Sequence, residues 1–305
     1  MTITESDTIN EVHRSAVVPS TTDLMVPPSV PGTAGRRELV GNVAIPLSRA
    51  LPRRLLGVWA HPDDEAYLSA GLMGRVIDSG GQVTLVTATR GELGSEDPEL
   101  AGSEAFAAYR EAELRSSLGE LGVTDVRVLG FPDGGCVATE SEMAVAALIG
   151  CIDELRPDAI VTFGPDGITG HPDHAQVSAW TTSAWWARRT GTELLYATMT
   201  SDFAREYGAM HDELGLFAEH RHGRPATVPQ AGVALECSLN RTELVRKRAA
   251  LARHGSQTDG LAQAVGEQTY FSWWRRETFR TPTASELAGQ MAPRADTGPD
   301  QRDDS

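Results

Sequence analysis

The chain of 305 residues has few cysteines, few aromatic residues and a deficit of positive charge. Its three cysteines, Cys136, Cys151 and Cys237, are scattered and show no Cys-x-x-Cys spacing, which argues against a disulfide framework and a cysteine metal site. Reduced thiols predict a cytoplasmic protein. The formal net charge of −15 would repel nucleic acid and anionic membranes, so we expect neither as a partner.

Long apolar runs are also missing. No stretch approaches the length of a membrane span, and the first residues lack the basic and apolar regions of a signal peptide. The polar segments 1–38 and 283–305 have no apolar periodicity, and we expect both to be disordered tails. A hydrophobic fraction of 40% is enough for a sizeable core, so we expect one α/β domain over residues 39–282.

Within that domain, short apolar runs alternate with segments of helical periodicity. Strands are predicted at Arg54–Ala60, Gln82–Ala88, Asp125–Leu129, Ala159–Phe163 and Glu193–Thr198. Helices are predicted at Glu65–Ser79, Glu104–Leu121, Glu140–Arg156, His174–Arg188 and Arg241–His254. This alternation favours a Rossmann-like, mostly parallel sheet with helices on both faces. The polar segment 201–236 is expected to form an insertion or a flap over the site.

Two motifs carry imidazole and carboxylate groups directly after predicted strands. The sequence AHPDDE spans residues 60–65, and GHPDH spans residues 170–174. Two imidazoles and a carboxylate are a usual ligand set for a catalytic zinc that keeps one position open, and a neighbouring carboxylate, Asp63, can act as a base. In the doubly wound strand order 3-2-1-4-5, the two motifs meet at the carboxyl ends of neighbouring strands. The pattern therefore predicts a metal hydrolase.

Simpler interpretations of these residues exist. Asp63, Asp64 and Glu65 also suit the positive end of a helix, so the first motif fits a helix cap as well as a ligand set. The spacing of His171 and His174 does not decide which of them binds a metal. Asp173 fits either a helix cap or a carboxylate that orients one imidazole by a hydrogen bond.

Together the two motifs resemble those of the PIG-L/LmbE-like zinc deacetylases. That family includes N-acetylglucosaminyl-inositol deacetylases of mycothiol and bacillithiol synthesis and enzymes that act on sugar-bearing antibiotics. The resemblance covers residues 54–174, and the sequence ARHGSQ at 252–257 is similar to a His-x-Ser-Gln stretch of many members. The resemblance implies the following roles: zinc ligands His61, Asp64 and His174, general base Asp63, and oxyanion donor His171.

The resemblance also implies the substrate, a small amino-sugar conjugate that loses an N-acyl group, in the first place acetyl. It suggests Arg110 and Asp133 as contacts to sugar hydroxyls, although an exposed helix charge and a turn residue are the simpler interpretations. Thr169 stands where the mycothiol-pathway deacetylase has a tyrosine. This departure disfavours that one substrate without weakening the prediction of a hydrolase.

Three other functions stay open. The first is an amidase of the same family that acts on a thiol conjugate or an acylated natural product. The second is an iron oxygenase, since two histidines and a carboxylate also bind Fe²⁺, but the strand–helix alternation disfavours the β-barrel usual for that class. The third is a non-catalytic sugar-binding protein. Zn²⁺ is the expected metal, Fe²⁺ fits the same ligands, and a homo-oligomer is left open.

Overall fold

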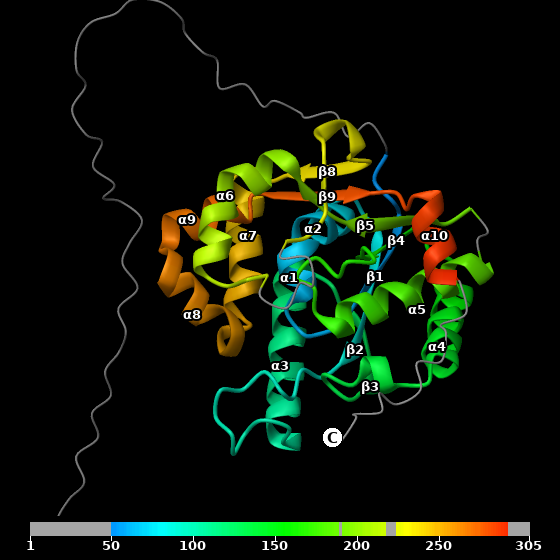
Figure 1. The fold of residues 1–305 in the computed structure, drawn as a ribbon, viewed down its shortest axis with the longest axis horizontal. Helices are drawn as coiled ribbons and strands as arrows, with labels where there is room; N and C mark the ends of the chain where they lie inside the picture. Colours follow the sequence, from blue (N-terminus) through cyan, green and yellow to red (C-terminus); the bar gives the residue numbers. More distant parts are fainter. Residues whose placement is uncertain (1–49, 189–190, 218–223, 292–305) are drawn as a thin grey trace, which may run out of the picture. The chain divides into compact units, whose positions relative to one another are not determined.

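The central sheet of this chain has the predicted strand order. The computed structural model describes residues 50–188, 191–217 and 224–291. Within them, seven strands follow the order β3-β2-β1-β4-β5-β9-β8, and a separate pair joins β6 to β7 (Figure 1). The strands extend over Arg54–Trp59 (β1), Gln82–Thr89 (β2), Asp125–Phe131 (β3), Ala159–Phe163 (β4), Glu193–Ala197 (β5), Met199–Thr200 (β6), Thr227–Val228 (β7), Leu235–Ser238 (β8) and Arg276–Arg280 (β9).

Strands β1 to β5 are parallel, whereas β9 runs antiparallel to both β5 and β8. The strand order reverses between β1 and β4, and α/β sheets bind ligands at the carboxyl ends of strands at such a point. The prediction of a mostly parallel sheet is confirmed. Strands β8 and β9 were not predicted. Strand β9 has the charged sequence RETFR, in which only alternate residues are buried.

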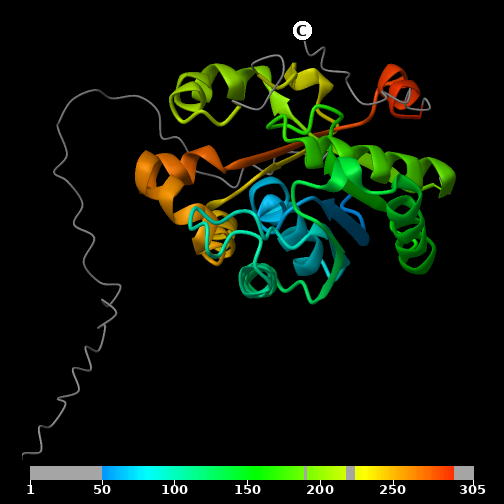
Figure 2. The same ribbon diagram turned by 60° about the horizontal axis from the view of Figure 1, so that its bottom comes forward.

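Helices cover both faces of the sheet, as predicted (Figure 2). Helices α2, α3 and α7 contact one another on one face, and α5 contacts both α4 and α10 on the other. The helices extend over Asp64–Leu68 (α1), Ala70–Asp78 (α2), Glu104–Leu121 (α3), Ser141–Leu155 (α4), Pro172–Arg188 (α5), Ser201–Glu213 (α6), Arg241–Ala252 (α7), Gly255–Val265 (α8), Glu267–Trp273 (α9) and Ala284–Met291 (α10), with 3-10 turns at Cys136–Ala138 (η1) and Gln230–Gly232 (η2). No described helix combines the length and apolar character that a membrane crossing needs.

Local sequence signals set the ends of the helices that flank the sheet. At the start of α3, the Ser103 hydroxyl accepts a hydrogen bond from the Phe106 N–H, and Gly122 ends the helix in the left-handed conformation with φ of 78°. At the start of α7, Asn240 and Glu243 form a reciprocal capping box. These ends agree with the prediction because both signals are local in sequence.

The C-terminal segment differs from its prediction. Residues from 283 onward were expected to be disordered, yet Ala284–Met291 form α10. Thr283 and Glu286 each bond the other's backbone N–H at its start, and Glu286 also pairs with Arg280 at 2.6 Å. A Thr-x-x-Glu capping box was therefore present within the polar sequence. The predicted tail 1–38 lies outside the described residues, as do residues 292–305 of the tail predicted over 283–305.

The predicted helix Glu65–Ser79 is divided at Ser69 into α1 and α2. The cause lies on β9, where the Glu277 carboxylate accepts hydrogen bonds from the Gly71 and Leu72 N–H groups at 2.7 and 2.8 Å. Lys247 Nζ donates to the same carboxylate at 2.8 Å, and both side chains are fully buried. An anion at a helix N-terminus is stabilised by the helix dipole, so Glu277 fixes the start of α2 as well as neutralising Lys247.

Glu277→Gln should therefore destabilise the fold strongly. Removing one partner of a buried ion pair leaves the other charge without compensation, which costs about 3–5 kcal/mol. Chemical denaturation measures the free energy of unfolding. The matched control is Asp202→Asn, which breaks the exposed Arg205–Asp202 pair on α6 and should cost less than about 1 kcal/mol. Equal losses in the two variants would contradict this account.

Candidate metal centre

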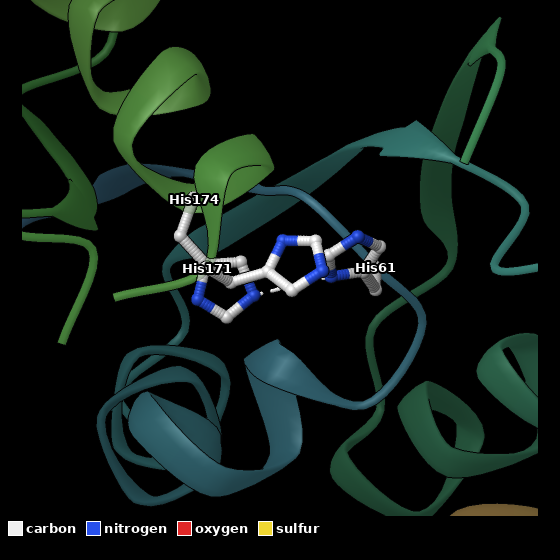
Figure 3. A group of neighbouring side chains, drawn as sticks. All are labelled: His61, His171 and His174. Atoms are coloured by element: carbon white, nitrogen blue, oxygen red, sulfur yellow. Dashed lines mark hydrogen bonds between the residues drawn. The ribbon is translucent and has the colours of Figure 1, made fainter. Parts of the chain in front are cut away.

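The loops that follow β1 and β4 bring three imidazole rings together (Figure 3). His61 Nδ1 lies 3.1 Å from His174 Nε2. Asp64 completes the arrangement, with its Oδ2 3.7 Å from His61 Nδ1 and its Oδ1 3.3 Å from His174 Nε2. The two sequence motifs therefore converge at the switch point of the sheet, as the strand order required.

These separations fit a single divalent cation. Donor atoms arranged tetrahedrally at about 2.0–2.1 Å from one metal lie about 3.3 Å from one another. The separation of His61 Nδ1 from His174 Nε2, 3.1 Å, and that of His174 Nε2 from Asp64 Oδ1, 3.3 Å, are close to that value, and His61 Nδ1 lies 3.7 Å from the other Asp64 oxygen, Oδ2. Two other groups of side chains around His61 could also hold an ion, because one ligand atom from each residue lies within 4.8 Å of the others. One adds His171 to His61 and His174, and the other joins His61 to Asp133 and Asp173.

The hydrogen bonds of the two histidines assign their protons. His174 Nδ1 lies 2.9 Å from the Gly167 carbonyl oxygen, which can only accept, so Nδ1 carries the proton and Nε2 presents its lone pair to the centre. His61 Nε2 lies 3.1 Å from Asp133 Oδ1 and 3.3 Å from Asp173 Oδ2, so it donates to carboxylates and Nδ1 faces His174. Metal-binding histidines are oriented in this way by carbonyl and carboxylate partners.

The electrostatics favour positive charge between these nitrogens. Burial disfavours a charged His61, but hydrogen bonds to Asp133 and Asp173 and the charge of Asp64 outweigh burial and raise the pKa of His61 to about 10. Burial and the nearby His61 hold the pKa of His174 well below its ordinary value. One positive charge, shared as a proton or supplied by a metal, is therefore stabilised at this point.

Asp64 is fixed by the loop in which it lies. Its Oδ2 accepts hydrogen bonds from the backbone N–H groups of Ala60 and His61 at 3.2 and 2.8 Å. The side chain is 10% exposed, and burial raises the pKa of this carboxyl group. The fold of the first motif thus holds one carboxylate oxygen toward His174 before any metal binds.

Asp63 occupies a strained position at the start of α1. Its φ of 127° is rare for a residue with a side chain, and such strain persists only where neighbouring contacts enforce it. The Glu65 carboxylate accepts the Asp63 N–H at 3.0 Å, and Arg110 Nη2 lies 3.2 Å from Asp63 Oδ2. Burial raises the pKa of Asp63 to about 6 against the opposing charge of Arg110. A carboxyl group whose pKa is close to neutral pH can both accept a proton and return it.

Glu65 is a support that the sequence analysis did not single out. It is completely buried, and its Oε1 lies 2.7 Å from His254 Nε2. His254 begins the His-x-Ser-Gln stretch, in which Ser256 Oγ donates to Glu113 at 2.6 Å and Gln257 donates to the Gly94 carbonyl at 2.9 Å. The C-terminal stretch therefore holds the first motif in place through the contact of His254 with Glu65. The third acidic residue of AHPDDE was the available signal.

His171 is partly exposed at the edge of the centre. Its Nδ1 accepts the Asp173 N–H at 3.2 Å, so in the neutral ring the proton is on Nε2. The His171 ring centre lies 4.7 Å from that of His61 and 5.1 Å from that of His174 (Figure 3). This places a donor beside the three ligand candidates. Thr169 instead contacts His174, with its Oγ1 3.2 Å from Nδ1.

The remaining candidates surround His61 and Asp63. Asp173 is completely buried, accepts the Gly134 and Cys136 N–H groups at 2.8 and 3.1 Å, and reaches His61 as predicted for an orienting carboxylate. Asp133 accepts the Leu93 N–H at 2.9 Å and faces the same imidazole nitrogen.

Arg110 lies beneath the first motif. It is 3% exposed and binds the Pro62 and Gly91 carbonyl oxygens as well as Asp63. The simpler interpretation of Arg110 as an exposed helix charge is therefore wrong. Its buried guanidinium instead supports the strained loop from the side of α3.

The fold and this donor set define a doubly wound α/β protein with a candidate divalent-metal centre at its switch point. A family model described as PIG-L, GlcNAc-PI de-N-acetylase, matches residues 56–185. The 1D-myo-inositol 2-acetamido-2-deoxy-alpha-D-glucopyranoside deacetylase of Actinosynnema mirum is 35% identical over 245 aligned positions, and the match covers 72% of this chain and 86% of that protein. The chain therefore belongs to the PIG-L family.

Other relatives agree over shorter stretches. The deacetylase of the same name from Streptomyces avermitilis is 40% identical over 146 aligned positions, and the match covers 41% of this chain and only 50% of that protein. Among solved structures, the N,N'-diacetylchitobiose deacetylase from Pyrococcus horikoshii has a TM-score of 0.54 at 19% identity, covering 82% of this chain and 92% of that one. This likeness shows that the fold is shared.

Gly91→Ala should disturb the support of Asp63. Gly91 has φ of 68°, and an added Cβ would lie 2.3 Å from Arg110 Nη1. The control is Gly102→Ala in the same loop, where φ is 77° and the nearest atom would be 3.6 Å away. Both variants carry the cost of left-handed backbone, about 1–2 kcal/mol, while Gly91→Ala adds about 1–3 kcal/mol of overpacking. Equal unfolding free energies in denaturation would contradict the predicted clash.

Proposed function

We propose that this chain is a metal-dependent hydrolase that removes an N-acyl group, in the first place acetyl, from an amino sugar or sugar conjugate. The observation that carries the proposal is the convergence of donor atoms from His61, Asp64 and His174. Asp63, the proposed base, directly precedes Asp64 in the chain and is held by Arg110. The names of the related proteins, which are deacetylases of N-acetylglucosamine conjugates, support it. Cytoplasmic location, a small amino-sugar partner and a homo-oligomer remain predictions.

Zinc is the metal that we propose for the centre. His61, Asp64 and His174 would hold it, because two imidazole nitrogens and a carboxylate leave one position of a tetrahedral site open. When bound, the metal acidifies water and polarises the amide carbonyl as a Lewis acid. Ferrous iron fits the same three ligands. The parallel sheet of this chain favours hydrolysis over an iron oxygenase, whose usual scaffold is a β-barrel.

The protein's own residues move the protons. Asp63 accepts a proton from the attacking water through a carboxylate oxygen and later returns it to the leaving amine nitrogen. His171 donates from Nε2 to the carbonyl oxygen as negative charge develops there, a contribution of about 3–4 kcal/mol for one well-placed donor. Arg110 holds Asp63 in its strained position throughout, since it binds both that carboxylate and the Pro62 carbonyl.

Sugar recognition is assigned to Arg110 and Asp133. The contact of Asp133 with His61 supports this assignment for Asp133. The Arg110 guanidinium is buried against the Pro62 and Gly91 carbonyl oxygens and Asp63, so Arg110 would act on a sugar through Asp63. Thr169 bonds His174 and stands where a tyrosine reaches the site in the mycothiol-pathway deacetylase. An amidase acting on a thiol conjugate or an acylated natural product is therefore the second candidate. Substrate screening with acetate or amine release separates the two.

Asp63→Asn should keep the metal and lose turnover. The amide retains the shape of the carboxylate but cannot take a proton, and removal of a general base costs about 10²–10⁴-fold in rate. Metal content by mass spectrometry and acetate release from an N-acetylglucosamine conjugate measure the two effects. Full activity in this variant would refute the role of Asp63.

Asp64→Asn should have the opposite signature, although the residue is the immediate neighbour of Asp63. It removes a charged ligand, so we expect the affinity for Zn²⁺ to fall by about 10-fold or more, with activity partly restored by excess metal. Calorimetric titration of the chelator-treated protein gives the affinity. Unchanged binding of one Zn²⁺ per chain would show that the metal lies elsewhere.

A further inference from the structure

A cavity of about 220 Å³ opens beside the candidate metal centre. It begins at Asp64, Thr169 and His174 and extends away from them toward α6 and α9. Its volume is about seven times the roughly 30 Å³ that one water occupies in the liquid. The methyl group of an acetyl substituent would leave most of this space empty.

Aromatic and aliphatic side chains form most of the cavity wall. They come from elements that are far apart in the sequence: Phe163, Met199, Phe203, Leu216, Phe217 and Trp273. Several polar side chains of the wall are already satisfied. The Glu277 carboxylate is held by Lys247 and two backbone N–H groups, and the Thr278 hydroxyl donates to the Thr198 carbonyl at 2.7 Å. The cavity therefore suits an apolar group.

The position of the cavity indicates which part of a substrate it receives. Arg110 and Asp133, the proposed sugar contacts, are not among the residues that line it. They lie next to Asp63 and to the Nε2 side of His61, whereas the cavity adjoins Asp64 and His174. In a trans amide, the sugar carbon on the nitrogen and the first carbon of the acyl chain lie on opposite sides of the C–N bond. A sugar held on the Asp133 side of His61 would therefore direct its acyl group into the cavity.

Two side chains that line the cavity each keep a buried donor with no acceptor among the described residues: His211 Nδ1 and Trp274 Nε1. Trp273 Nε1, which can only donate, gives its hydrogen to His211 Nε2 at 2.9 Å. The proton of a neutral His211 is consequently on Nδ1, and the residue is only 2% exposed. Buried donors without partners call for an explanation, and an oxygen atom on a bound ligand supplies one.

We propose that the natural substrate carries an N-acyl group larger than acetyl, mostly apolar and bearing one oxygen acceptor, and that this group occupies the cavity. The inference rests on the proposed function. Water adds to the acyl carbon, the C–N bond breaks, and the nitrogen takes a proton. The products are a free amino sugar and a carboxylic acid of medium length, so an N-acyltransferase reaction must supply the substrate.

A series of N-acylglucosamines tests this with the zinc-loaded wild-type protein. Acetyl, butanoyl, hexanoyl and 5-oxohexanoyl derivatives are compared by the glucosamine that they release. Burial of each methylene should raise kcat/KM by about threefold, so the four methylenes that separate hexanoyl from acetyl should give about 80-fold when all are buried and about tenfold when two are. The 5-oxo chain should exceed the hexanoyl chain, because its oxygen can accept from the unpartnered donors.

The outcomes separate this inference from the proposed function. If acetyl is cleaved fastest, the acyl assignment is overturned while the deacetylase stands. If alkyl glycosides of N-acetylglucosamine gain instead of longer acyl groups, the sugar's aglycone occupies the cavity and the inference fails. If no derivative releases glucosamine, both proposals fail.

A matched pair of variants gives an independent check on the location. Leu214 and Leu216 are both half-buried in the same apolar cluster, but only Leu216 lines the cavity. Leu216→Trp should fill the space and lower kcat/KM for hexanoyl by about tenfold, with acetyl changed by less than about twofold. Leu214→Trp should leave the ratio of the two substrates unchanged. An unchanged ratio in folded, zinc-binding Leu216→Trp would overturn the proposal.

Discussion

The rest of the structure depends on one electrostatic constraint, the close approach of two imidazole nitrogens in a setting of carboxylates. His61 Nδ1 and His174 Nε2 lie 3.1 Å apart, and the other nitrogen of each ring is committed to an acceptor. Two lone pairs so close repel each other unless a cation lies between them. Asp64 adds negative charge at the same point. The fold therefore creates a position where positive charge is required.

The candidate metal centre is supported by residues on several helices and on one strand. Glu65 connects the first motif to His254, and Glu277 sets where α2 begins. Arg110 holds the strained backbone of Asp63 from the side of α3. Each support comes from a segment remote in sequence from the site. Changes at these supports should therefore act on stability and on the geometry of the centre together.

The sequence was informative where the signal is local. Strand Ala159–Phe163 and helix Glu104–Leu121 were predicted with their observed ends, because a continuous apolar run, a serine cap and a terminal glycine define them. The two motifs and the strand order together predicted that His61 and His174 meet. By contrast, the break at Ser69 depends on Glu277, which lies about two hundred residues away in the sequence. The antiparallel strand β9 was missed because its sequence is charged and only alternate residues are buried. The cavity could not be predicted, because its wall combines residues of nine helices and strands that are distributed from α1 to β9.

The most direct test of the central claim is anomalous X-ray scattering at the zinc edge, from crystals of the chain with one equivalent of Zn²⁺. The account predicts one strong peak about 2.0–2.2 Å from His61 Nδ1, His174 Nε2 and an Asp64 oxygen. A principal peak on the other side of His61, between Nε2 and the carboxylates of Asp133 and Asp173, would contradict it.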